Sequence, residues 1–187
     1  MVLFPSREEA LAVLREHTQG DSLLKHAYAV EAAMRFYAAH FGEDPERWGA
    51  AGLLHDFDYE RYPSLDDHPF KGAEILRSRS YDAELIDTIL SHADHTGVPR
   101  NTPMRKSLFA VDELCGFVTA VTLVRPSKKI EEVEPSSVKK KLKDKGFART
   151  VSREDIVAGA ELIEIPLDAH IRNVITAMRG IAGELGL

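Results

Sequence analysis

Apolar residues recur at helical spacing along almost the whole chain, and this periodicity constrains the fold more than any other feature. Residues 23–41 carry apolar side chains at intervals of three and four, and residues 104–118 carry a similar stripe. No stretch alternates apolar and polar residues in the way that is typical of a half-buried strand. The pattern therefore predicts an all-α fold.

Capping signals divide this pattern into about eight or nine helices. Residues suited to the first turn of a helix mark five of the starts: Ser6 with Glu9, Asp44 with Pro45, Thr102 with Pro103, Pro135, and Ser152 with Asp155. Further helices are expected over about 21–41, 69–78 and 81–92, and the last over about 167–185.

The length of 187 residues and the hydrophobic content of 44% suit one compact domain with a complete core. We expect a single domain over residues 1–187. Residues of about 21–125 would form its central part, 126–150 a basic loop and short helix, and 152–187 the C-terminal helices. Cys115 is the only cysteine, which excludes an internal disulfide framework and a cysteine-rich zinc ribbon.

The chain shows no signal for export or for insertion into a membrane. No charged and then apolar leader follows Met1, and no apolar run approaches the length of a transmembrane helix. Together with the single cysteine, this predicts a soluble cytoplasmic protein without a membrane partner. The sequence leaves the oligomeric state open.

The charge of the chain is distributed unevenly. The formal net charge is −6, which argues against extended binding of nucleic acid. Residues 125–149 nevertheless contain nine Lys or Arg and only four Asp or Glu. This basic segment is either a solvated surface helix or a local patch that faces an anionic ligand.

Six histidines and aspartates are usual ligands of divalent transition metals: His26, His55, Asp56, His68, His92 and Asp112. Three of them, His26, His55 and Asp112, lie beside apolar helix faces and should be partly buried. A buried carboxylate is costly unless it is paired or bound to a cation. Taken singly, each of these histidines is more often a hydrogen-bonded core residue than a ligand. Three other histidines look like surface positions: His17, His40 and His170.

The order of these residues along the chain resembles that of a known family. The resemblance rests on two motifs: Ala-Gly-Leu-Leu-His-Asp, which ends at Asp56, and Phe-Ala-Val-Asp-Glu-Leu around Asp112. From about residue 21 to residue 125 the chain is similar to the HD-domain superfamily of metal-dependent phosphohydrolases. The resemblance implies a helical HD-domain fold in which His26, His55, Asp56 and Asp112 bind one divalent metal.

Two further segments resemble the branch of that family that holds two metals. The segments around His68 and His92 are similar to those that supply its extra histidines, and Asp56 would bridge the two ions. The Ser91-His92 pair and Gly97-Val98-Pro99 differ from the adjacent histidines and the Gly-Tyr-Pro motif of the cyclic-dinucleotide phosphodiesterases, which argues against that branch.

The residues after the His-Asp doublet depart from the family pattern. Phe57-Asp58-Tyr59 stands where many relatives have a small residue and then glycine or lysine, so a lysine acting just after the doublet is absent. Lys71 is the candidate replacement. Asp58, one turn after His55, either orients a ligand histidine, accepts a proton, or is a solvated residue at the end of its helix.

The donor set indicates the chemistry. Imidazoles and carboxylates without thiolate suit one or two ions of Mn²⁺, Fe²⁺, Co²⁺, Ni²⁺ or Zn²⁺. Such an ion supplies hydroxide at neutral pH for attack on phosphorus, with Asp56 central to the reaction. We expect a small phosphomonoester, nucleotide or dinucleotide as substrate, bound by Arg125 and Lys128 if their loop folds back over the metals. The pocket would be formed by loops at about 57–68, 93–102 and 125–135.

Two other functions remain open from the sequence. The same six residues could hold two irons for an oxygenase of the HD fold. The chain could also be a non-catalytic module that binds a nucleotide or a partner and uses a metal only for structure.

Overall fold

The computed structural model describes residues 4–187, and those residues form ten α-helices, two 3-10 helices and no strand. The α-helices are α1 (Arg7–His17), α2 (Asp21–Phe41), α3 (Pro45–Leu54), α4 (Phe70–Ser78), α5 (Ala83–Ser91), α6 (Pro103–Leu123), α7 (Pro135–Leu142), α8 (Arg153–Leu162), α9 (Leu167–Arg179) and α10 (Ala182–Leu185). The 3-10 helices are η1 (Asp94–Thr96) and η2 (Ile130–Glu132). The predicted all-α fold is confirmed.

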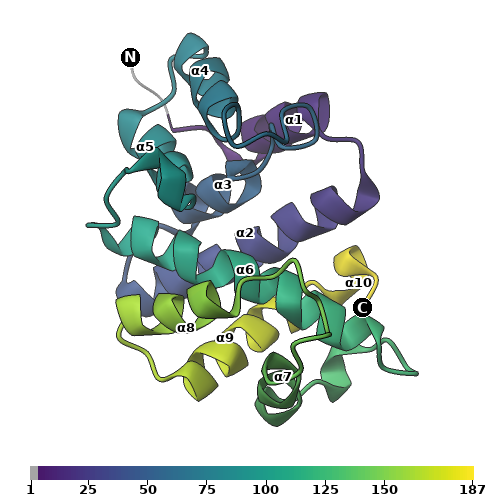
Figure 1. Ribbon diagram of the computed structural model, residues 1–187. Helices are drawn as coiled ribbons and strands as arrows, with labels where there is room; N and C mark the ends of the chain where they lie inside the picture. The colour runs from purple at the N-terminus through teal and green to yellow at the C-terminus, as the bar shows by residue number, and fades with distance from the viewer. Residues whose placement is uncertain (1–3) are drawn as a thin grey trace.

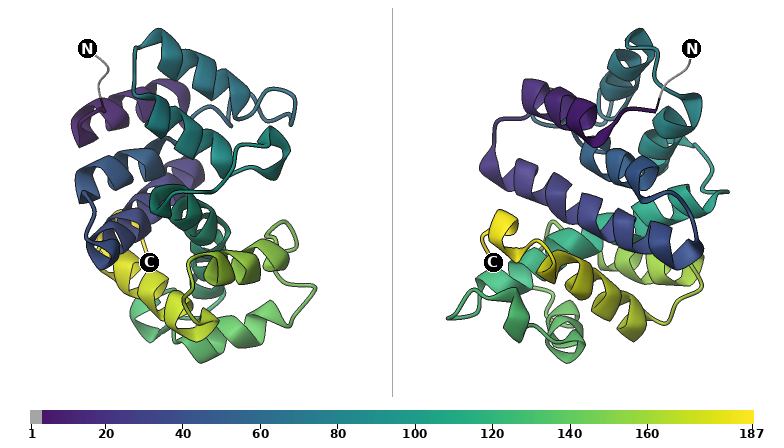
Figure 2. Two further views of the ribbon diagram at one scale, coloured as in Figure 1. Left: turned by 90° about the vertical axis from the view of Figure 1, so that its left-hand side faces the viewer. Right: turned by 180° about the vertical axis from the view of Figure 1, so that it is seen from behind.

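The two longest helices, α2 and α6, pack against each other in the middle of the molecule (Figure 1). Helices α1, α3, α4 and α5 lie on one side of α2, and α7, α8, α9 and α10 lie on the other (Figure 2). One cluster of buried apolar side chains extends from Ala10 in α1 to Leu185 in α10. Because α2 and α6 meet at its centre, side chains from both can reach one site.

The close packing of α3 on α2 depends on Gly52. A Cβ atom built on Gly52 would lie 2.9 Å from the backbone N and Cα atoms of Glu31 in α2. Backbone atoms in a packed helix cannot move aside as a flexible side chain can. The missing side chain therefore allows the end of α3, where His55 lies, to approach α2.

The five predicted helix starts are confirmed. Ser6 and Glu9 form the reciprocal capping box, with Ser6 N–H donating to Glu9 Oε2 at 2.7 Å. Asp44 Oδ1 accepts from Glu46 N–H at 2.9 Å, with Pro45 in the first turn. The apolar stripe that predicted α6 is buried along its whole length, including Leu108 and Cys115.

The expectations about the last helix and about two histidines were wrong. The last helix is divided into α9 and α10, because Gly180, a poor helix former, ends α9 and Ile181 leaves helical geometry. His17 and His170 are buried rather than exposed. His17 Nδ1 bonds Val13 O, and His170 lies between Tyr37 Oη at 2.6 Å and Ala110 O at 2.9 Å.

No helix within residues 4–187 combines the length and the apolar character needed to cross a membrane. The start of the chain, on which the expectation of no leader partly depends, includes Met1–Leu3, which lie outside the described residues.

Candidate metal centre

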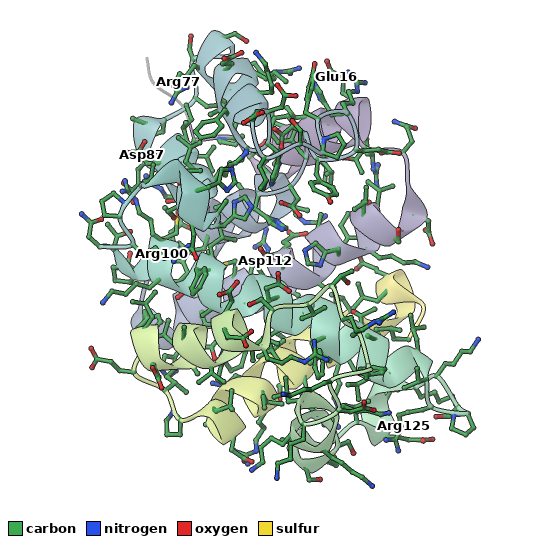
Figure 3. All side chains as sticks on the ribbon, in the orientation of Figure 1. Glu16, Arg77, Asp87, Arg100, Asp112 and Arg125 are labelled. Atoms are coloured by element: carbon green, nitrogen blue, oxygen red, sulfur yellow. The ribbon has the colours of Figure 1, made fainter. Side chains whose placement is uncertain are left out.

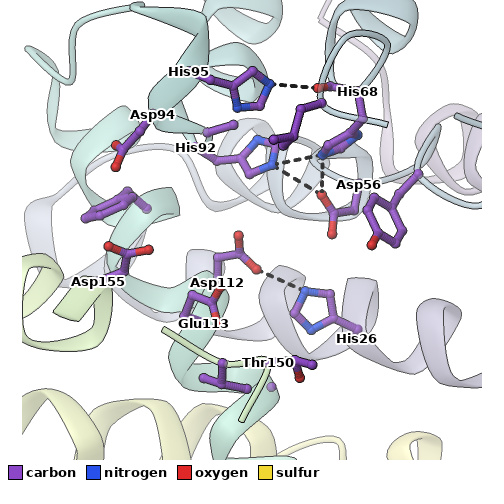
Figure 4. Close-up of a pocket in the computed structure, with 16 residues that line it drawn as sticks. His26, Asp56, His68, His92, Asp94, His95, Asp112, Glu113, Thr150 and Asp155 are labelled. Atoms are coloured by element: carbon purple, nitrogen blue, oxygen red, sulfur yellow. Dashed lines mark hydrogen bonds and ion pairs between the residues drawn. The ribbon is translucent and has the colours of Figure 1, made fainter. Parts of the chain in front are cut away.

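All six predicted ligand side chains meet at one place between α2, α3, α5 and α6, and Figure 4 labels five of them, His26, Asp56, His68, His92 and Asp112. Each comes from a different part of the helical framework: His26 from α2, His55 and Asp56 from the end of α3, His68 from the residues before α4, His92 from the end of α5, and Asp112 from α6. They form two groups, and in each group the ligand atoms lie within 4.8 Å of one another.

The first group contains His26, His55, Asp56 and Asp112. Asp112 Oδ1 lies 3.0 Å from His26 Nε2 and 3.4 Å from His55 Nε2. The two imidazole nitrogens lie 3.2 Å apart. His55 is fully buried, while His26 and Asp112 are partly buried, as the sequence predicted.

The second group contains Asp56, His68 and His92. Asp56 Oδ1 lies 3.2 Å from His68 Nε2 and 3.3 Å from His92 Nε2. Its other oxygen, Oδ2, lies 3.4 Å from His55 Nε2 in the first group. The carboxylate of Asp56 therefore contributes one oxygen to each group.

Hydrogen bonds at Nδ1 of the His55 and His92 rings direct their Nε2 atoms into the site. His55 Nδ1 bonds Gly52 O at 2.8 Å, and His92 Nδ1 bonds Ile89 O at 2.5 Å. A carbonyl oxygen only accepts, so Nδ1 of these rings carries the hydrogen and Nε2 keeps its lone pair in the neutral form. The same bonds hold ligand histidines in metal sites.

The donor atoms of the site fit a metal ion. His68 Nε2 and His92 Nε2 lie 3.3 Å apart, and two lone pairs at that distance repel unless a proton or a metal cation lies between them. The set of imidazoles and carboxylates, without a thiolate, suits divalent transition metals. The two groups could therefore each hold such an ion.

The charges within the site shift the pKa values of its members strongly. Burial opposes a charge on His55, but the carboxylates of Asp56 and Asp112 outweigh burial and raise the pKa of His55. Burial also opposes charge on His68, yet the hydrogen bonds that its ring donates to Asp56 and Asp58 raise the pKa of His68 to about 9. The pKa values of Asp56 and Asp112 are lowered in return, because the histidine charges outweigh their burial. A metal ion must displace protons to bind here.

Five of the six candidate ligands, all except the fully buried His55, line a cavity of about 470 Å³ (Figure 4). Apolar side chains of its lining include Tyr59, Leu65 and Phe109, and carboxylates beyond the two ligand aspartates come from Asp94, Glu113 and Asp155. No Lys or Arg lines this cavity within the part of the chain that the structure describes. The loops predicted at 57–68 and 93–102 contribute to the lining, whereas the predicted loop at 125–135 does not.

Asp58 is buried and does not line the cavity. Its Oδ1 accepts from His68 Nδ1 at 2.9 Å, and its Oδ2 accepts from Gly72 N–H at 2.7 Å. Of the roles considered for Asp58, the geometry matches orientation of a ligand histidine. It excludes a solvated residue at a helix end, and it gives Asp58 no direct contact with a substrate.

The three basic residues predicted to bind substrate lie outside the cavity. Lys71 pairs with Glu74 at 3.0 Å on the surface of α4. Arg125 lies beyond the end of α6, about 20 Å from Asp112 at the rise of an α-helix (Figure 3). Its loop, which includes exposed Lys128, is held on α9 because Arg179 donates to carbonyl oxygens of that loop. This loop therefore does not fold back over the metal groups.

Residues that sequence reasoning missed form one wall of the cavity. Thr150, Val151 and Asp155 reach it from the segment before α8 and from its first turn. Ser152 N–H donates to Glu113 Oε2 at 3.2 Å, which ties this segment to α6. Burial, with the charge of Asp112, raises the pKa of Glu113 to about 7. Asp155 was noted only as a helix-capping residue, and no motif marks the others.

Comparison with protein families identifies the central part of the chain. Residues 23–115 match the family model of the HD domain, a range that contains all six candidate ligands. No solved structure matches the chain. HD domains bind divalent metals and are in general metal-dependent phosphohydrolases. By this match, together with the all-α fold and the His-Asp groups, the chain belongs to the HD-domain superfamily.

Proposed function

We propose that the protein is a divalent-metal-dependent phosphohydrolase that acts on a small phosphomonoester, nucleotide or dinucleotide. The observation that carries this proposal is the position of the Asp56 carboxylate. Its two oxygens face different histidine groups, 3.2 Å from His68 and 3.4 Å from His55, as a carboxylate shared by two ions would. Paired metal sites are a common device for hydrolysing phosphate esters.

In this proposal His26, His55, Asp56 and Asp112 hold one ion, and Asp56, His68 and His92 hold the other. The donor set suits Mn²⁺, Fe²⁺, Co²⁺, Ni²⁺ or Zn²⁺. A bound divalent ion lowers the pKa of a coordinated water to about 7 and so supplies hydroxide at neutral pH.

The protein groups around the site have distinct roles. The Gly52 and Ile89 carbonyls and the Asp58 carboxylate fix the orientation of three histidine rings. Two divalent ions exceed the charge of the two ligand aspartates, so the site attracts a phosphate group. Tyr59 and Leu65 add apolar surface to the lining of the cavity. Lys71, Arg125 and Lys128 have no part in this scheme.

The proposal is tested by removing bound metal with a chelator, restoring single metals, and assaying phosphomonoesters and nucleotides. We expect two metal ions per chain by elemental analysis and hydrolysis that depends on added metal. Asp56→Ala should lose activity, because that carboxylate serves both groups. His40→Ala removes an exposed histidine and is the matched control.

Other outcomes point to other functions. Oxygen consumption with bound iron, and no hydrolysis under anaerobic conditions, would favour the diiron oxygenase. A metal-loaded protein that hydrolyses no phosphate ester, yet gains thermal stability from one nucleotide, would favour the non-catalytic module. Hydrolysis that survives Asp56→Ala would refute the two-metal scheme.

A further inference from the structure

A second cavity, of about 640 Å³, borders the metal cavity. Its lining contains four basic side chains, Lys143, Lys145, Arg149 and Arg153, and one carboxylate, Glu154. Thr150 and Val151 line both cavities, so these two residues form the boundary between them. The basic segment noted in the sequence therefore reaches the metal cavity through residues 143–151, here called the basic loop, and not through Arg125.

Arg153 holds the basic loop in a defined shape. Its guanidinium donates to the carbonyl oxygens of Ala148 at 2.8 Å, Val151 at 2.7 Å and Asp144 at 3.2 Å, and to that of Phe147. The guanidinium of Arg153 is therefore occupied by backbone carbonyl oxygens of the loop. Lys143, Lys145 and Arg149 remain exposed, and no carboxylate pairs with them within residues 4–187. Three cations therefore line this cavity without an ion-pair partner among the described residues.

The metal cavity has open space beside α6 at Gly116. Gly116 lies one turn after Asp112 and lines the metal cavity. A Cβ atom built on Gly116 would meet no heavy atom within 4 Å.

The stretch between the two cavities is acidic. Glu113 lies between Asp112 and Thr150 in Figure 4, and Asp155 reaches the same cavity from α8. An anionic group placed here would be repelled by the Asp155 carboxylate, and by Glu113 when Glu113 is ionised, since like charges in a partly desolvated cavity interact strongly. Anions are therefore favoured at the metal groups and at the basic loop, but not between them.

We propose that the basic cavity binds a second anionic group of the substrate, which an uncharged spacer separates from the phosphate at the metal groups. The inference rests on the proposed function and narrows its substrate class. A nucleoside bisphosphate with phosphates on different ribose hydroxyls has this form. A nucleoside triphosphate does not, because its adjoining phosphates would lie among Glu113 and Asp155.

The test compares a nucleoside 5′-monophosphate with the nucleoside 3′,5′-bisphosphate in the metal-loaded protein. Wild-type protein should have a lower KM for the bisphosphate. The double variant Lys145→Gln/Arg149→Gln should raise that KM about tenfold with kcat little changed, because two charge-assisted contacts are lost. The double variant Arg77→Gln/Lys140→Gln changes charge equally at exposed positions that line neither cavity, and it should not change that KM.

A binding measurement separates this proposal from the proposed function. In chelator-treated protein, inorganic pyrophosphate should bind by calorimetry, more weakly at higher salt, and binding should be lost in Lys145→Gln/Arg149→Gln. Equal KM values for both nucleotides in wild-type protein, or equal effects of the two double variants, would overturn the substrate subsite. If no ester is hydrolysed, the proposed function fails, and the calorimetry alone then decides whether the cavity binds anions.

Discussion

Replacement of Asp58 by asparagine tests whether this buried residue controls the second metal group. The wild-type carboxylate accepts from two donors, His68 Nδ1–H at 2.9 Å and Gly72 N–H at 2.7 Å. Asparagine has the same shape but only one accepting oxygen. Its NH₂ group must then face one of the two donors. If it faces His68, the ring must carry its hydrogen on Nε2 instead, and that nitrogen can no longer bind a metal.

Two independent arguments give the size of the effect. Loss of a charge-assisted hydrogen bond at a buried donor costs about 1.5–3 kcal/mol. Changes to the groups that hold ligand histidines lower metal affinity about 10–100-fold, which is equivalent to about 1.4–2.7 kcal/mol. The two ranges overlap. We therefore expect Asp58→Asn to lower the affinity for the ion at His68 and His92 by about 10–100-fold.

The assay is a competition titration against a chromophoric chelator, with metal content measured in parallel. The affinity for one ion should fall. The affinity for the ion at His26, His55 and Asp112 should change by less than about threefold, because Asp58 bonds none of these residues. Asp66→Asn, an exposed acid in the same loop, is the control for charge alone. Equal loss at both ions, or no loss at either, would refute this account of Asp58.

Three further predictions concern stability, each measured by chemical denaturation. Burial lowers the pKa of His170 to about 4. The unfolded chain binds this proton near pH 6.5, so the protein should lose about 3 kcal/mol of stability as the pH falls from about 7 to 4. In His170→Gln, which cannot titrate, that part of the loss should be absent, and an unchanged pH profile would contradict the assignment. Gly52→Ala places a Cβ 2.9 Å from the backbone of Glu31 and should destabilise the protein by about 1–3 kcal/mol. Gly116→Ala, the same change in a helix with open space around it, should stabilise the protein by about 0.5–1 kcal/mol, and equal signs for these two variants would contradict the packing argument.

The fold could be predicted largely because its signals are local. Leu108 and Cys115 in α6 are seven residues apart and both buried, so periodicity alone places them on one face. Asp44 and Pro45 mark the start of α3 through bonds within one turn. The division of the last helix was missed because the glycine at its C-terminus, Gly180, was not weighed against a continuing apolar pattern.

The candidate ligands were predictable for a different reason. Periodicity placed His26, His55 and Asp112 beside apolar faces, but only the resemblance to a family connected them with His68 and His92. The burial of Asp58 was not predictable, because it depends on Gly72, fourteen residues away and in the next helix. His170 was misjudged in the same way, since its partners Tyr37 and Ala110 lie on other helices.

The position of the basic segment relative to the metal groups could not be predicted from the sequence. Its charge allowed either a solvated surface helix or a patch that faces an anionic ligand, and it did not indicate which part lies near the metal groups. That choice depends on two arginines. Arg179 holds the loop near Ile130 on α9, through a bond that spans 49 residues, and Arg153 shapes the loop that ends at Val151. Only one of these loops borders the metal cavity, and a long-range bond to a backbone carbonyl leaves no periodic trace in the sequence. The composition therefore located a basic segment, while the part of it that borders the metal cavity depends on contacts that only the fold supplies.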